Sequence, residues 1–202
     1  LKVEAETPAE YLILNIWDDD HYRNLDAWRS IRARRRGRFT LPHLRVDVER
    51  GTCDEVDNPC LTGDEVYRLC DPDWVWQTFR EDPILDGIIA KETSSTDSDS
   101  ERKAGSPAQH ANAGSDARVY QLYTEAALVA TKHVVSLTER FAKEHQKQLM
   151  LILSFGQKSM AAALKGEPLF DQSFLDWLRE KDYPVVDSFQ SELRVITSYD
   201  GE

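Results

Sequence analysis

Three consecutive carboxylates and an imidazole follow an apolar run near the start of the chain. Asp18, Asp19, Asp20 and His21 come directly after Tyr11–Trp17. Carboxylates and imidazoles act as nucleophiles and as general acids and bases, and neighbouring carboxylates repel unless a cation, a proton or a set of donors compensates. A strand that ends this way is typical of a parallel strand opening into a ligand-binding crevice. The alternative interpretation is a solvated turn in an acidic protein.

Two later apolar runs are predicted to form strands beside the first. They are Leu149–Phe155 and Pro184–Asp187, and their continuous apolar character favours strands that are covered on both faces. Helical patterns cover Val119–His145, Lys158–Leu164 and Gln172–Lys181. Alternation of strands and helices favours right-handed crossovers and a parallel sheet. We therefore expect a three-layer α/β domain with an irregular insertion.

The carboxyl ends of parallel strands lie on one side of a sheet, which places the candidate site. Ser154 leaves the second strand there, so it should lie near residues 18–21. Asn15 and Asn24 are the nearest amides. We expect Asn24 to contribute to substrate binding and Asn15 to point into the packing of its strand.

The middle of the chain is predicted to be an insertion or cap, residues 22–116, with the core formed by residues 1–21 and 117–202. Residues 93–116 are rich in Ser, Asp, Gly and Ala, which indicates a flexible loop. The segment from Arg29 to Arg38 is locally basic and could be either a solvated face or an anion-binding edge.

Local signals within and after the insertion predict further elements. Residues 41–48 alternate like a short strand. Thr62 and Glu65 have the spacing of a capping box, and a second helix should begin at Pro72 or Asp73. Asp171 is expected to cap the last helix.

Charge and composition narrow the function classes. The chain has 202 residues and a formal net charge of −11, which argues against a general nucleic-acid binder, because such a protein needs a basic surface. No apolar run reaches the roughly 20 residues of a membrane-spanning helix. The odd number of cysteines favours reduced thiols at Cys53, Cys60 and Cys70, although a disulfide between the first two is possible.

Neither compartment nor oligomeric state can be read from this sequence. The chain begins on Leu1 rather than Met and ends on Glu202 without a closing element. We therefore expect it to be part of a longer protein.

The opening strand and the second half of the chain resemble the SGNH (GDSL-type) hydrolase superfamily. Trp17, Asp18, Asp19 and Asp20 occupy the position of that family's Gly-x-Asn-Asp block, and the helix–strand order of residues 117–190 resembles the later part of its domain. The resemblance implies a flavodoxin-like sheet and an esterase that needs no cofactor. Its substrate would be a small-molecule, carbohydrate or lipid ester.

The chain departs from the SGNH pattern in its catalytic groups. The resemblance places the nucleophilic serine before Leu1 and the histidine base after Glu202, so both are expected outside this sequence. An ionised Asp19 would repel an oxyanion where the family has an amide donor.

A second resemblance is to haloacid-dehalogenase-type phosphatases, in which a hydrophobic strand ends in Asp-x-Asp. Asp18 and Asp20 have that spacing, which implies a nucleophile and an acid/base. Ser154 would bind phosphate, Lys158 or Lys165 would neutralise it, and Asp187 would hold Mg²⁺. Tyr22 stands where that family has Thr or Val.

A third hypothesis is a binding module without catalysis. In that case an acidic loop and the pair Trp74 and Trp76 would form a surface for a partner protein.

Overall fold

The computed structural model describes residues 5–25, 41–80 and 113–189. The chain divides into two compact units. One combines Leu1–Asn24 with Ala130–Glu202, and the other comprises Leu25–Val129. The long helix α7, Ala113–Glu144, begins in the second unit and ends in the first.

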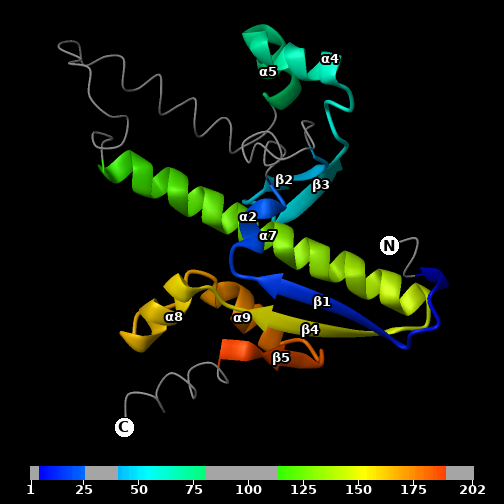
Figure 1. Cartoon of the computed structure of the whole chain (residues 1–202). Helices are drawn as coiled ribbons and strands as arrows, with labels where there is room; N and C mark the ends of the chain where they lie inside the picture. The colour runs from blue at the N-terminus through cyan, green and yellow to red at the C-terminus, as the bar shows by residue number, and fades with distance from the viewer. Residues whose placement is uncertain (1–4, 26–40, 81–112, 190–202) are drawn as a thin grey trace. The chain divides into compact units, whose positions relative to one another are not determined.

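The first unit contains a parallel sheet of three strands, β1 (Tyr11–Trp17), β4 (Gln148–Ser154) and β5 (Val185–Asp187). The order is β1-β4-β5, and Figure 1 shows the three arrows side by side. Tyr11 pairs with Gln148 and Trp17 with Ser154, so β1 and β4 are matched over their whole length. This confirms the predicted strands and their parallel direction.

One face of this sheet forms the core of the unit. Leu149, Leu151 and Leu153 of β4 alternate on that face and are buried. The helices contribute buried apolar residues to the same unit: Val135 and Ala142 from α7, and Phe174, Leu175 and Leu178 from α9. The chain is therefore an α/β protein in this part, built by the alternation that the sequence predicts.

The opposite face of the sheet carries exposed apolar side chains. Tyr11, Ile13 and Trp17 are 47%, 57% and 46% exposed, and Val186 is 51% exposed. The expectation that the two later strands are covered on both faces is wrong for β5, all three of whose residues are exposed, whereas β4 is buried on one face and half-buried on the other. The physical reason is that β5 is an edge strand of three residues, which has a neighbouring strand on one side only and offers little surface for packing.

Two helices lie between β4 and β5. Helix α8 spans Gln157–Leu164 and ends in a turn where Gly166 has a positive φ of 74°. Helix α9 spans Gln172–Arg179. Asp171 is its N-cap residue by position but makes no capping hydrogen bond, which corrects the expected role of that carboxylate.

The second unit contains an antiparallel hairpin of β2 (His43–Asp47) and β3 (Thr52–Val56). Only the first of these strands was predicted from the sequence. The turn between them uses Gly51 with a φ of 64°, which favours glycine.

Short helices follow the hairpin: α4 (Gly63–Val66), the 3-10 helix η1 (Tyr67–Cys70) and α5 (Pro72–Phe79). Thr62 and Glu65 form the predicted capping box, with Thr62 Oγ1 accepting from the Glu65 N–H at 3.3 Å. Asp71 caps α5, and Pro72 is its first residue. Both helix starts are therefore confirmed.

Several smaller expectations can also be compared with the structure. A flexible loop was predicted over residues 93–116, but residues 113–116 belong to α7, so the prediction is wrong for these four residues. The rest of that prediction lies outside the described residues. The basic segment from Arg29 to Arg38 also lies outside them. No disulfide joins the three cysteines. Within the described ranges, no helix is both long and apolar enough to cross a membrane.

Candidate functional site at the carboxyl edge of the sheet

Asp18 joins the end of β1 to the start of α8. Its backbone N–H donates to the Ser154 carbonyl at 3.1 Å and extends the pairing of the two strands by one residue. Its side-chain Oδ2 accepts from the Gly156 N–H at 2.8 Å and from Ser159 Oγ at 2.5 Å. The half-buried carboxylate is therefore held by two donors from α8 and its cap.

Gly156 explains why Asp18 lies there. It is the N-cap of α8 and has no side chain to accept from the first helical N–H groups. Asp18, at the end of another strand, accepts from the Gly156 N–H and from the Ser159 hydroxyl, and its negative charge lies at the positive end of the helix dipole. A Cβ at position 156 would lie 3.2 Å from both Asp18 carboxylate oxygens, so any other residue there would make the carboxylate shift by a few tenths of an ångström.

Asp19 and Asp20 pair with one arginine. Arg23 binds Asp19 Oδ2 at 2.5 Å and also binds Asp20 Oδ1. Asp20 Oδ2 additionally accepts from the Trp17 N–H at 3.1 Å. The repulsion expected among the three carboxylates is thus compensated by Arg23 and by N–H and O–H donors.

His21 lies in the interior rather than at an open surface. It belongs to α2 (Asp20–Arg23), and its exposed fraction is 1%. Its Nδ1 lies 2.8 Å from Thr131 Oγ1, and its Nε2 lies 3.5 Å from Asp171 Oδ2. Asn24 Nδ2 donates to the same Thr131 oxygen at 3.2 Å. His21 and Asn24 therefore share a partner on α7.

Aromatic rings surround this imidazole. The Phe174 ring meets it edge-on with centroids 5.0 Å apart, and the Phe170 ring does so at 5.9 Å. Tyr22 stacks on Phe170 at 5.8 Å. This packing fixes α2 against the segment that leads into α9.

Ser154 is close to the acidic turn through its backbone, but its side chain has a different partner. Its Oγ donates to Asn15 Oδ1 at 3.1 Å. Asn15 is exposed and shares its face of the sheet with Ile13 and Trp17. The expectation that Asn15 points into packing is therefore wrong, because that face is uncovered in the described part.

The remaining residues of the phosphatase hypothesis are distributed around the unit. Lys158 and Lys165 are exposed, on α8 and just after it. Asp187 ends β5, and its Oδ1 accepts from the Phe189 N–H at 2.9 Å. Across the described ranges, no three His, Cys, Asp or Glu side chains form a group that could hold a metal ion.

Four residues near this edge were not predicted from the sequence to belong to the site: Gly156, Ser159, Thr131 and Asp171. The small residues after Ser154, at Gly156 and Ser159, are the signal that could have been noticed, since parallel strands place that loop beside Asp18. Thr131 lies within a long amphipathic helix and gives no local signal.

Two cavities lie away from this edge. One of about 320 Å³ is at the amino end of the sheet, where Glu139, Lys143 and Tyr183 are among the lining residues. Burial and a hydrogen bond to Glu139 raise the pKa of Tyr183 to about 12, and the hydrogen bond from Lys143 lowers the pKa of Glu139. Lys147 also lines this cavity and donates to the Thr7 and Ala9 carbonyls, each at 2.7 Å.

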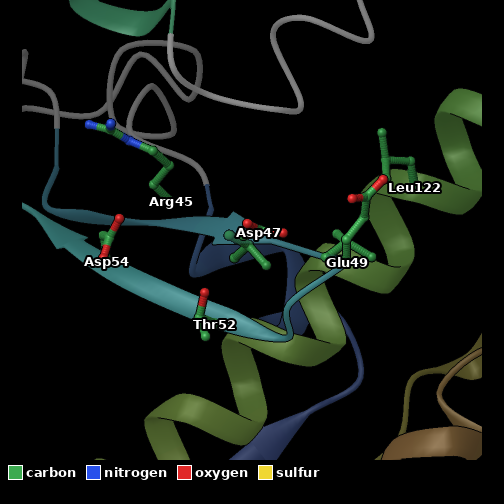
Figure 2. Close-up of a pocket in the computed structure, with 8 residues that line it drawn as sticks. Arg45, Asp47, Glu49, Thr52, Asp54 and Leu122 are labelled. Atoms are coloured by element: carbon green, nitrogen blue, oxygen red, sulfur yellow. The ribbon is translucent and has the colours of Figure 1, made fainter.

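The second cavity, of about 490 Å³, belongs to the hairpin unit. Figure 2 shows Asp47, Thr52 and Asp54 on the β2–β3 strands, with Glu49 in the turn and Leu122 on α7. Asp47 Oδ1 accepts from the Arg50 N–H at 3.0 Å. The lining combines three carboxylates with one arginine, Arg45, and with the apolar side chains of Val46, Val48 and Leu122. None of the sequence-predicted site residues contributes to it.

Comparison of the chain with protein-family models, with curated proteins and with solved structures finds no match.

Proposed function

We propose that the unit containing β1, β4 and β5 is the later part of an SGNH-like ester hydrolase with a three-layer, flavodoxin-like fold. The single observation that carries the proposal is the sheet itself. Three strands that are consecutive within this unit are also neighbours in space and run parallel. Polar residues that follow β1 and β4 meet at the carboxyl edge, where open α/β sheets bind ligands.

The uncovered face of the sheet supports the three-layer part of the proposal. Parallel sheets occur almost always with helices on both faces. Tyr11, Ile13 and Trp17 would be buried by such a layer, and their apolar character suits that position. We therefore expect the whole polypeptide to place helices there.

In an ester hydrolase of this kind, a serine attacks the ester carbonyl and a histidine removes the serine proton. Both groups are proposed to lie outside residues 1–202. Asp18 would hold the β1 and β4 loops together beneath the reacting groups. Asp19, Asp20 and Arg23 would form the exposed rim that contacts substrate.

The oxyanion of the intermediate needs hydrogen-bond donors, and carboxylates cannot supply them. Asn15 shares its face of the sheet with Ile13 and Trp17, which the proposed second layer of helices would cover, so its amide is not placed for this role. Asn24 is half-buried, and its amide nitrogen donates to Thr131. The oxyanion donors are therefore proposed to lie, like the serine and the histidine, outside residues 1–202.

One observation favours the phosphatase hypothesis as a second candidate. Asp18 Oδ2 accepts both hydrogen bonds, from the Gly156 N–H and the Ser159 hydroxyl. Its Oδ1 has no hydrogen-bond partner among the described residues. A nucleophilic carboxylate would present its second oxygen in this way. Asp20 would then act as acid/base and Mg²⁺ would bind near the phosphate.

A paired assay separates the candidates. The complete polypeptide that carries residues 1–202 would be tested on p-nitrophenyl acetate and p-nitrophenyl phosphate, with and without EDTA. The proposal predicts ester hydrolysis that EDTA leaves unchanged and that falls in Asp19→Ala, because Asp19 belongs to the exposed rim proposed to contact substrate. Asp182→Asn serves as the control, since Asp182 is exposed and lines the cavity at the opposite end of the sheet.

Other outcomes would contradict the esterase. Phosphate hydrolysis that EDTA inhibits and Asp18→Asn abolishes would establish the phosphatase. Activity on neither substrate, with every variant folded, would favour the binding module. The Trp76 side chain, which is 46% exposed, would then be available to contact a partner protein.

A further inference from the structure

Asp171 is a buried carboxylate with one neighbour that can compensate its charge. Its exposed fraction is 2%, and within the described part of the chain its Oδ1 has no hydrogen-bond partner. Its Oδ2 faces His21 Nε2 at 3.5 Å. An isolated ionised carboxylate is strongly disfavoured in an apolar interior. Either His21 carries a positive charge, or the carboxyl group holds a proton.

The hydroxyl groups of α7 indicate whether the other ring nitrogen of His21, Nδ1, carries a proton. Three hydroxyl groups of this helix each donate to the carbonyl four residues earlier: those of Thr124, Ser136 and Thr138. We infer the same donation for the Thr131 hydroxyl, whose oxygen then accepts from Asn24 Nδ2 and from His21 Nδ1. In that arrangement His21 Nδ1 is a donor and carries a proton.

We propose that His21 and Asp171 hold one further proton between Nε2 and Oδ2, and that His21 is thereby a positioning residue for the acidic turn Asp18–Asp20. With Nδ1 protonated, the pair is neutral as a unit, whether it is imidazolium with carboxylate or imidazole with carboxylic acid. The inference goes beyond the proposed ester hydrolysis and does not depend on it.

The position of His21 in the chain links the His21–Asp171 pair to the acidic turn. It lies in the four-residue helix α2, which also contains Asp20 and Arg23. So short a helix is not stable alone, so its place must come from tertiary contacts. The pair, together with the packing of Phe170 and Phe174 against the ring, supplies an interior anchor for that helix.

Nitrogen NMR of the histidine rings tests the proton arrangement. The whole chain would be labelled with ¹⁵N-histidine, and His21 assigned by loss of its signals in His21→Gln. We expect wild-type Nδ1 to be proton-bearing, and Asp171→Asn to shift Nε2 while Nδ1 keeps its proton. A wild-type Nδ1 without a proton, or an Nε2 signal that is the same in Asp171→Asn, would overturn the proposal.

Limited trypsin digestion tests the positioning role. Cleavage after Arg23, identified by mass spectrometry, should be about tenfold faster in Asp171→Asn, as expected when a buried hydrogen-bonded group loses its partner. Asp176→Asn is the matched control, because Asp176 lies on α9 but is exposed and pairs with Arg179. Equal cleavage in the two variants would contradict the role. If Asp171→Asn does not fold, the wild-type Nδ1 and Nε2 signals decide instead: a proton-bearing Nδ1 beside an Nε2 that neither carries a proton nor accepts a hydrogen bond would overturn the proposal.

Neither measurement involves hydrolysis of a substrate. Failure of the ester-hydrolase proposal would therefore leave the His21 result unchanged, and the reverse also holds.

Discussion

The Asp18 carboxylate and the Gly156 N–H meet at 2.8 Å although 138 residues separate them in the chain. The contact joins the end of β1 to the start of the helix that follows β4. It shows how an acidic cluster is retained at a strand end without an apolar environment forcing it to neutralise. Donors from α8 and its cap hold Asp18, and Arg23 pairs with its two neighbours.

Gly156→Ala should destabilise the protein by about 1 kcal/mol, because the added Cβ would lie 3.2 Å from both Asp18 oxygens and force them to move. The backbone at Gly156 is extended, so alanine adds no conformational strain there. Urea denaturation measures the change. Gly63→Ala is the control, since its Cβ would meet nothing within 4 Å. Equal stabilities of the two variants would show that the contact is not tight.

Ser159→Ala should cost about 1.5 to 3 kcal/mol, because a buried hydroxyl that donates to a charged group is lost. Ser136→Ala removes a hydroxyl that donates only to its own helix, to the Lys132 carbonyl at 2.9 Å. That control should change stability by less than about 0.5 kcal/mol. Thermal unfolding of both variants compares them directly, and a Ser159→Ala midpoint equal to wild type would contradict the bond to Asp18.

Much of the fold followed from local signals in the sequence. The apolar runs gave β1, β4 and β5, and the Thr62–Glu65 spacing gave the start of α4. These signals work because side-chain periodicity and capping depend on neighbours in the chain. The exposure of β5 and of one face of β1 did not follow, because the apolar sequence of a strand does not reveal which of its faces another element packs against.

The site was predictable only in part for a similar reason. The turn at Asp18–Asp20 and its meeting with the β4 loop followed from strand direction. The partner of His21 did not follow, because Asp171 has the sequence position of a helix cap and only tertiary packing turns it toward the imidazole.

Cys53 should react slowly with iodoacetamide. Burial, and secondly the charge of Asp54, raise its pKa to about 11, so only about one molecule in a thousand is thiolate at pH 8. Asp54→Asn lowers that pKa and should accelerate the reaction. Peptide mass spectrometry gives the rate at each cysteine. Cys70 is exposed and is the reference, and modification of Cys53 at the Cys70 rate would contradict the burial.

Tyr183 should ionise only near pH 12, because burial and then its hydrogen bond to Glu139 raise its pKa. A tyrosine whose pKa is raised from 10 in the folded state stabilises the fold below pH 10, and this contribution is lost between pH 10 and 12. Ultraviolet titration of tyrosinate, taken as the difference between the wild type and Tyr183→Phe, separates Tyr183 from the other six tyrosines of the chain. Glu139→Gln should move the transition toward pH 10, whereas Glu144→Gln, at an exposed position of α7, should not. A wild-type transition at pH 10 would refute the assignment.

Covalent labelling with a fluorophosphonate, read by intact mass and peptide mapping, tests the ester-hydrolase proposal most directly. The reagent phosphonylates an activated serine and ignores a nucleophilic aspartate. We expect the complete polypeptide to take one adduct, on a serine outside residues 1–202. No adduct, or an adduct on Ser154 or Ser159, would contradict the proposed function.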